Sequence, residues 1–243
     1  MCTVIVHVPE SADQPTRVLA VRDEDPARPW QPPGAWWPDT YPAVVGVRDV
    51  RAGGAWLAAS AEARRLAVLL NRAELAAVEG DELQSRGGVV LEAVAGRSPG
   101  DSPPTHGFNL VEVEGSRTRV TTWDGVEVRT TDLPPGTHMI AHEGVDDAAT
   151  PRIAQWLAAF AEQRTDAGDP AEWFAPWLGL LEASTALPAT DDRAIVRDNR
   201  PHGFPTLSLL VCVATVGPDG VDLASGAFDE PGRWNTLTLR QPR

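Results

Sequence analysis

The first two dozen residues combine groups that could carry out nucleophilic catalysis. Cys2 follows the initiator Met1 and precedes an apolar run, Thr3–Val8. A second apolar run at residues 17–21 ends in the charged cluster Arg22-Asp23-Glu24. Two strands joined by a turn over residues 9–15 would bring the end of the second run back to the start of the first. We therefore expect an arginine and two carboxylates within reach of a thiol near the chain start.

Removal of Met1 would change the chemistry of Cys2. Cysteine is small enough that the aminopeptidase acting on initiator methionine normally removes the residue before it. The mature chain would then begin with a free α-amino group beside a thiol. An α-amine titrates near pH ~8 and a thiol near ~8.5, so the amine can accept the thiol proton. One residue then supplies both nucleophile and base. Arg22 would lower the thiol pKa and Asp23 would hold the new ammonium group, although a solvated strand end is the alternative for this cluster.

Residues 24–42 are rich in proline and tryptophan, and this composition predicts a structured loop. Proline is excluded from helix interiors and central strands, and three tryptophans within eight residues are costly to leave in water. The loop would lie over the mouth formed by the first two strands. Its tryptophans either fill the domain edge or form a wall of a ligand pocket. The candidate ligand-binding tryptophans are Trp36, Trp37 and Trp56.

Polar side chains at two other places could also serve a site. Asn71 ends a predicted strand, where a side chain can donate to a tetrahedral oxyanion or simply form a turn. His138 and His142 fall in a predicted strand at an even separation, so they would share one face and point into one cleft with the tryptophans. Such a pocket would suit a flat anionic ligand such as haem or an acyl-coenzyme A. Ordinary structural or surface histidines are the alternative.

Hydropathy patterns and turn signals predict the elements that position these residues. Further strands are expected at residues 44–50, 56–59, 66–71, 107–113, 118–123, 127–131, 138–142, 207–216, 221–228 and 235–240. The strands up to residue 71 are expected to pair with the first two in one antiparallel sheet. Helices are expected at residues 89–95, 150–163 and 171–185, the last two capped by Thr150 and Asp169. No linker divides the chain, so residues 1–243 are expected to form a single α+β domain.

Several short motifs follow one another along the chain. They begin with Met1-Cys2-Thr3 and a predicted strand ending in Leu-Ala-Val-Arg-Asp-Glu at residues 19–24. Others follow at residues 53–57 (GGAWL), 71–72 (NR), 85–87 (SRG), 107–110 (GFNL) and 133–137 (LPPGT). Their order and spacing resemble those of the NRDE family, named for Asn-Arg-Asp-Glu, which includes the transport and Golgi organisation protein two. The family is similar to N-terminal-nucleophile hydrolases. The resemblance therefore implies a four-layer αββα sandwich with two stacked, mainly antiparallel sheets, and a role in haem handling has been proposed for some members.

Three positions depart from the family pattern. Val21 stands where asparagine opens the signature, and Pro205 stands where a later Thr-Arg-Thr stretch has arginine. His142 aligns with a family asparagine, which in related N-terminal-cysteine amide hydrolases helps to stabilise the oxyanion. A histidine can also donate there, but its charge depends on pH. The resemblance thus implies catalysis by Cys2 with Asn71 and His142 at the oxyanion, and the departures bear on amidase activity.

Composition excludes several classes of protein. The net charge of −13 argues against nucleic acid or an anionic membrane as a partner, and all 21 basic residues are arginine. Cys2 and Cys212 have no partner at metal-ligand spacing, so no metal site is expected. Cys212 lies within an apolar run, which predicts a buried, unreactive thiol. With no leader and no apolar run of ~18 residues, we expect no membrane span and a reducing, cytoplasmic location.

Two functional hypotheses follow. In the first, the chain is an N-terminal-cysteine hydrolase or acyl-transferring enzyme that acts on an amide or thioester of a small metabolite and requires no cofactor. In the second, it is a non-enzymatic protein on the same fold that binds or carries haem or a lipid-like metabolite beneath the tryptophan-rich segment. A small-molecule ligand or substrate is the expected partner in both.

Overall fold

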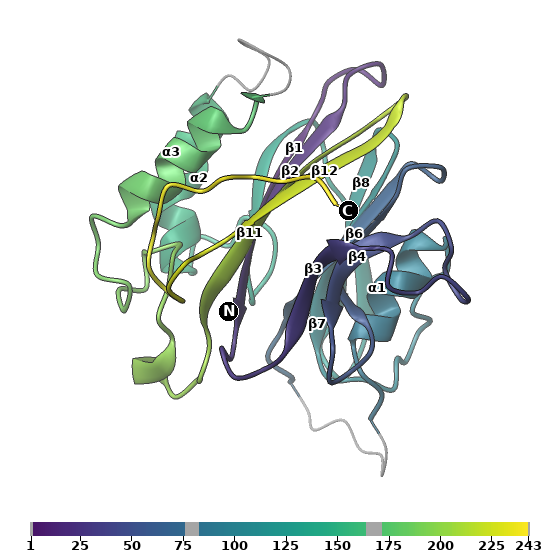
Figure 1. Cartoon of the computed structure of the whole chain (residues 1–243), viewed down its shortest axis with the longest axis horizontal. Coiled ribbons are helices and arrows are strands. Elements are labelled where there is room, and N and C mark those ends of the chain that lie inside the picture. The colour runs from purple at the N-terminus through teal and green to yellow at the C-terminus, as the bar shows by residue number, and fades with distance from the viewer. Residues whose placement is uncertain (1, 76–82, 164–171, 243) are drawn as a thin grey trace.

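The computed structural model describes residues 2–75, 83–163 and 172–242. Two antiparallel sheets are stacked face to face, with helices on both outer faces (Figure 1). Helix α1 covers the seven-stranded sheet, and helices α2 and α3 cover the five-stranded sheet. The predicted fold class, a mainly antiparallel αββα sandwich, is confirmed.

The five-stranded sheet has the strand order β10-β1-β2-β11-β12. Its strands are β1 (Thr3–Val8), β2 (Thr16–Glu24), β10 (Gly136–Ile140), β11 (Leu207–Gly217) and β12 (Gly220–Ala227). Strand β1 lies between β10 and β2, with Val4 opposite both Ile140 and Ala20. β2 and β11 are almost wholly buried, because helices cover one face of this sheet and the second sheet covers the other.

The seven-stranded sheet follows the chain in simple sequence order from β3 to β9. Its strands are β3 (Trp30–Gly34), β4 (Val45–Asp49), β5 (Ala55–Ser60), β6 (Arg65–Asn71), β7 (Phe108–Glu114), β8 (Arg117–Trp123) and β9 (Val128–Asp132). Each strand pairs antiparallel with the next, and tight hairpins join β5 to β6, β7 to β8 and β8 to β9. Helix α1 lies in the connection between β6 and β7.

The helices are α1 (Gly87–Val94), α2 (Pro151–Glu162) and α3 (Ala175–Ser184), and a short 3₁₀ turn spans Arg200–His202. Helix α1 approaches β5 very closely at two glycines. A Cβ added to Gly87 would lie 2.9 Å from the Cα of Gly54, so neither position has room for a side chain. Thr150 is the N-cap residue of α2 as predicted, but its hydroxyl donates to Asp147 and not to the helix.

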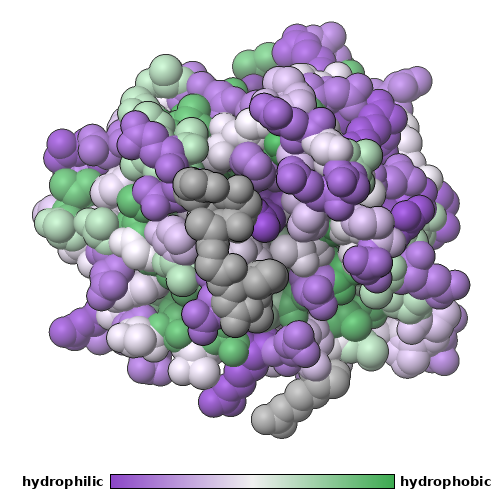
Figure 2. Space-filling view, turned by 90° about the horizontal axis from the view of Figure 1, so that it is seen from above, coloured by the Kyte–Doolittle hydropathy of each residue, from purple (hydrophilic) through white to green (hydrophobic). Residues whose placement is uncertain are grey.

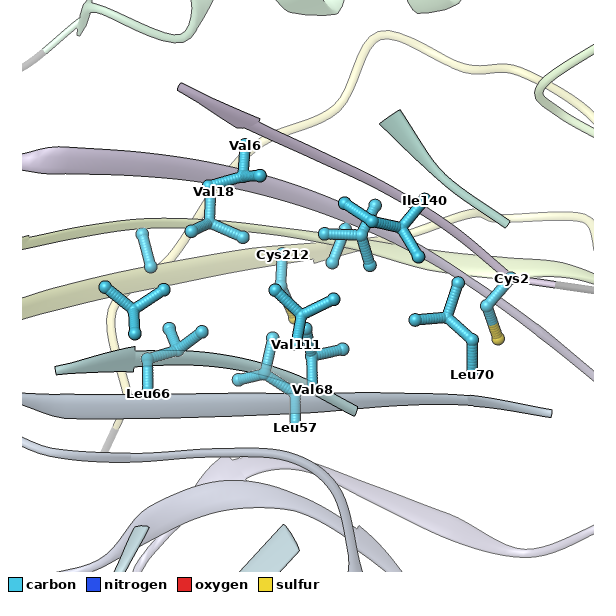
Figure 3. Close-up of a cluster of buried hydrophobic side chains, with 14 of the residues drawn as sticks. Cys2, Val6, Val18, Leu57, Leu66, Val68, Leu70, Val111, Ile140 and Cys212 are labelled. Atoms are coloured by element: carbon cyan, nitrogen blue, oxygen red, sulfur yellow. The ribbon is translucent and has the colours of Figure 1, made fainter. Parts of the chain in front are cut away.

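Three apolar layers hold the sandwich together. The largest lies between the sheets and contains one face of β1, β2, β6 and β11, including Val6, Leu66 and Cys212 (Figure 3). A second layer joins the outer face of the five-stranded sheet to α2 and α3, where Trp177 and Phe160 meet edge to face. A third fills the space beneath α1. Alternate residues of each strand enter different layers, as the two-residue repeat of a strand requires.

Several predicted elements are placed differently. The predicted single sheet was wrong, because β1 and β2 belong to one sheet and β4 to β6 to the other. The predicted loop over residues 24–42 contains strand β3, which can accommodate Pro32 and Pro33 because an edge strand leaves one side of its backbone unpaired. Residues 235–240 form no strand and join β12 only through the Ser225–Arg240 bridge.

Two further boundaries differ from prediction. Strand β10 ends at Ile140, so His142 lies beyond it and not on the same strand face as His138. Helix α3 begins at Ala175, and the predicted Asp169 cap lies outside the described residues. In the described part of the chain no helix is long and apolar enough to cross a membrane. Hydrophilic residues predominate on the face shown in Figure 2, with small apolar patches between them.

Candidate active site

Cys2 lies at one end of the layer between the sheets, beside Leu70 (Figure 3). Its Sγ accepts a hydrogen bond from the Asp23 backbone N–H at 3.4 Å and donates to the Asp23 carbonyl at 3.6 Å. The residue is 8% exposed, and burial, followed by the negative charge of Asp23, raises the pKa of the thiol. The predicted proximity of Cys2 to the end of β2 is therefore present, and the thiol is buried there.

Arg22 and Asp23 point to opposite faces of the five-stranded sheet because they are neighbours on β2. Arg22 shares the strand face of Val18 and Ala20 and so enters the layer between the sheets, on the side of Cys2. Its Nη2 lies 3.3 Å from Glu24, and its guanidinium lies over the Trp30 ring at 5.9 Å. Its Nη1 is buried and has no hydrogen-bond partner among the described residues. Arg22 thus supplies a buried positive charge on the thiol side.

Asp23 faces the helix layer, where buried side chains hold its carboxylate. Oδ1 accepts a 2.6 Å hydrogen bond from the Ser208 hydroxyl, and Oδ2 accepts one from Asn199 Nδ2 at 3.2 Å. Asn199 is held in turn by Arg197, whose Nε donates to its Oδ1 at 2.9 Å. Arg197 also donates its backbone N–H to Ser208 Oγ at 2.9 Å. All four residues are buried, so the carboxylate is fixed beside the start of β1.

Arg152 reaches the same end of the sheet from the first turn of α2. Its side chain is 2% exposed, and its Nη2 donates a long 3.5 Å hydrogen bond to the Cys2 carbonyl. Burial, together with the positive charge of Arg197, lowers the pKa of Arg152 to about 10. His142 is half-buried nearby, and desolvation and the charge of Arg152 lower its pKa. The terminus of β1 is therefore surrounded by more positive charge than the sequence analysis anticipated.

Asn71 is not brought to Cys2. Leu66, Val68 and Leu70 enter the layer between the sheets, so strand alternation directs Asn71 to the other face, where it is exposed. A buried asparagine next to His142 is Asn109 on β7, whose Nδ2 donates to the carbonyls of Ala141 at 2.7 Å and His142 at 3.2 Å. Asn109 therefore anchors the bend that carries His142, and its amide is already occupied.

His138 has both ring nitrogens occupied. Nδ1 pairs with Asp146 Oδ2 at 2.7 Å, and Nε2 lies 2.9 Å from the Pro134 carbonyl. The hydrogen bond to Asp146 raises the pKa of His138 against the opposing effect of burial. His138 therefore ties β10 to the turns on either side of it and has no free nitrogen for a ligand.

The three candidate tryptophans occupy three different environments. Trp56 lies in the layer between the sheets and Trp37 in the layer beneath α1, where its Nε1 donates to the Gly53 carbonyl. Trp36 lines a cavity of about 880 Å³ between the edge strands β3 and β12, together with Trp30 and Arg240. Cys2 is not among the residues that line this cavity. The predicted tryptophan pocket and the predicted thiol site are thus separate.

Sequence reasoning missed Arg152, Arg197, Asn199 and Ser208. The sequence contains a signal that could have identified two of them, Ser208 and Arg152, as site residues. Ser208 is a polar residue within a near-continuous apolar run, and Arg152 is a cation in the first turn of a helix, where the helix dipole disfavours it. The described residues contain no group of three or more His, Cys, Asp and Glu side chains that could hold a metal ion.

Comparison with known proteins identifies the family. The family described as Transport and Golgi organisation 2 matches residues 1–202, which include Cys2, the Arg22-Asp23-Glu24 cluster, Arg152 and Asn199. A search of curated proteins found no match. Because the matched segment covers well over half of the 243 residues, the chain belongs to the Transport and Golgi organisation 2 family, which is the NRDE family.

Proposed function

We propose that the protein is an N-terminal-cysteine hydrolase or acyl-transferring enzyme that acts on an amide or thioester of a small metabolite. The observation that carries the proposal is the contact of Cys2 Sγ with the backbone of Asp23, whose carboxylate is held by Ser208 and Asn199. If removal of Met1 creates an ammonium group at the start of the first strand, the fixed Asp23 carboxylate can hold that group by a charge-assisted hydrogen bond.

The reaction begins after removal of Met1. The α-amine of Cys2 takes the thiol proton, and the thiolate attacks the carbonyl carbon to form a carbon–sulfur bond. The resulting ammonium returns the proton to the leaving nitrogen or sulfur as that bond breaks, which leaves an acyl-enzyme. Water, or an acceptor molecule in the transfer reaction, then attacks the thioester carbonyl and gives its proton to the α-amine. The carbon–sulfur bond breaks, which releases the acyl product and regenerates the Cys2 thiol with that proton. Asp23 holds the amine in place, and Arg22 favours the thiolate on its side of the sheet.

Oxyanion stabilisation in this scheme falls to His142 more than to Asn71. His142 is half-buried near the chain start, whereas Asn71 points away. Because desolvation and Arg152 lower the pKa of His142, the ring is neutral at pH 7 and would act as a hydrogen-bond donor. A reducing, cytoplasmic setting would keep the thiol free.

The test compares the two cysteines in the mature protein. Intact mass first establishes whether Met1 is removed, because a retained Met1 blocks the α-amine and contradicts the proposal. Iodoacetamide labelling followed by peptide mapping then reports the reactivity of each thiol. We expect labelling of Cys2 in the wild type and in Cys212→Ala, and no labelling of Cys2→Ala. Labelling of Cys212 at the same rate as Cys2 would show that the chain-terminal thiol has no special activation.

A second candidate function, ligand carriage, is favoured by the cavity between β3 and β12. Trp30 and Trp36 could stack on a flat ligand, and Arg240 at the rim could meet its negative charge. The lining residues include no histidine, cysteine, methionine or tyrosine, and His138 has no free nitrogen, so the site does not fit a haem iron that needs an axial protein ligand.

The carrier function is tested by titration with an acyl-coenzyme A and with a fatty acid. Binding that quenches tryptophan fluorescence in the wild type and weakens in Trp36→Ala would support it. Equal binding by Trp37→Ala is the control, because Trp37 lies in the layer beneath α1. Unchanged binding by Trp36→Ala would exclude this cavity as the ligand site.

A further inference from the structure

Arg152 is a buried cation that forms no ion pair with a described residue. Burial and the charge of Arg197 lower its pKa, and the more distant negative charge of Asp23 only partly opposes this. Its hydrogen bond to the described part of the chain is the 3.5 Å contact with the Cys2 carbonyl, and its Nε is buried with no described partner. Its neighbour Arg197 is different, since the Arg197 guanidinium donates to Asn199, to loop carbonyls and to the Asp192 carboxylate. Because burial without a close partner is unfavourable for an ion, Arg152 destabilises the fold more than Arg197 does.

The surroundings add to this cost. Arg152 is the second residue of α2, and the first turn of that helix contains no acidic residue. The positive end of the helix dipole and the charge of Arg197 both oppose a guanidinium there. The same features that destabilise an isolated cation would strongly favour a bound anion.

A second polar atom at this place also lacks a partner. In the described part of the chain, His142 Nδ1 is buried without a hydrogen bond, and Nε2 lies 3.5 Å from Glu143. The His142 side chain is 22% exposed, so the ring reaches solvent, and burial followed by the nearby charge of Arg152 lowers its pKa. Asn109 and Arg72 hold the bend that carries the residue, through hydrogen bonds to the His142 carbonyl. The backbone of His142 is therefore held in place, and its ring is a partly exposed group beside a buried positive charge.

From these observations we infer an anion-binding site at the start of β1, with Arg152 at its floor and His142 at its entrance, which takes a small carboxylate-bearing ligand. A carboxylate matches the planar guanidinium of Arg152 and can accept more than one hydrogen bond from it. Entry of the ligand requires displacement of the His142 ring, which no described carboxylate other than the exposed Glu143 restrains.

This site refines the proposed function without depending on it. If the proposed reaction holds, the site receives the carboxylate of the substrate, and the substrates are amides or thioesters that carry a carboxylate close to the scissile bond. That assignment rests on the proposed function, whereas the anion site itself rests only on Arg152 and His142.

The experiment measures stabilisation of the full chain by succinate, with succinamide as the neutral probe and sodium chloride at equal ionic strength as the screening control. Thermal unfolding and calorimetric titration are recorded for the wild type, Arg152→Met, Arg152→Lys and Arg193→Gln. Arg193 is an exposed arginine paired with Asp191, so its replacement controls for loss of one positive charge. None of these measurements requires turnover or a processed terminus.

We expect succinate to raise the unfolding temperature of the wild type and of Arg193→Gln above the values in chloride, and succinamide to have no such effect. Arg152→Met should lose this response, and without succinate it should unfold at or above the wild-type temperature, because an unpaired charge has been removed. Arg152→Lys should bind about tenfold more weakly or worse, as expected for losing a charge-assisted hydrogen bond.

Three results would overturn the inference. The first is equal stabilisation of the wild type by succinate and by chloride. The others are stabilisation of Arg152→Met by succinate as large as that of the wild type, and an affinity of Arg152→Lys for succinate equal to that of the wild type. If Arg152→Met does not fold, Arg152 is structural and the inference fails as well. An Arg152-dependent response in a protein whose Cys2 is unreactive would reject the proposed reaction and keep the anion site.

Discussion

Ser208 should be one of the most costly serines to truncate, because two buried groups depend on its hydroxyl. Its O–H donates to the Asp23 carboxylate at 2.6 Å, and its oxygen accepts the Arg197 backbone N–H at 2.9 Å. Ser208→Ala removes a hydrogen bond to a charged group, worth about 1.5–3 kcal/mol. It also leaves the buried Arg197 backbone N–H without an acceptor, which costs about 1–3 kcal/mol. We expect a loss of about 3–5 kcal/mol in the free energy of unfolding.

The matched control is Ser184→Ala. Ser184 is equally buried, but its hydroxyl donates at 2.7 Å to the Leu181 carbonyl within α3, and alanine is the better helix former. Its loss should be about 1 kcal/mol or less. Urea denaturation followed by circular dichroism measures both, and at about 2–4 °C per kcal/mol the difference is also visible in thermal unfolding. If Ser208→Ala costs no more than Ser184→Ala, the carboxylate of Asp23 is not held as described.

Further predictions concern pH, packing and thiol reactivity. The raised pKa of His138 stabilises the fold fully below the unfolded value of ~6.5, and this stabilisation is lost as pH rises through the folded value. The stability difference between wild type and Asp146→Asn, measured in urea, should therefore shrink from about pH 6 to about pH 9, and a constant difference would contradict the ion pair. Gly87→Ala should destabilise by about 1–3 kcal/mol through contact with the β5 backbone. Gly88→Ala, which meets nothing within 4 Å, should stabilise by about 0.5–1 kcal/mol, and equal effects of the two would refute the close approach. Burial raises the pKa of the Cys212 thiol, so it should react with a disulfide reagent only in urea, and native-state reaction would show that the layer between the sheets opens.

Local patterns predicted individual elements well. The apolar run that became β11, the stripe on α2 and the hairpins β4–β5, β5–β6, β7–β8 and β8–β9 are each encoded within a few neighbouring residues. Assignment of strands to sheets failed because it depends on contacts between distant parts of the chain. Val4 pairs with Ile140, and no local feature of β1 distinguishes that partner from β4.

In the candidate site, too, contacts between neighbouring strands were predicted and contacts between distant parts of the chain were missed. The approach of Cys2 to Asp23 follows from one hairpin and was predicted. The groups that hold Asp23 lie 176 and 185 residues further along the chain, at Asn199 and Ser208, and only the fold brings them there. The position of Asn71 at a strand end predicted a donor to the oxyanion, but the direction of its side chain depends on which face of β6 is buried.

Strand β11 has a practical consequence for anyone who expresses this protein. The family match ends at residue 202, but β11 begins at Leu207 and runs along β2 from Thr16 to Glu24. A fragment cut at the end of the match would leave β2 as an uncovered, apolar edge, which is a template for intermolecular strand pairing. Such a fragment is expected to aggregate, and expression trials should therefore extend through β12.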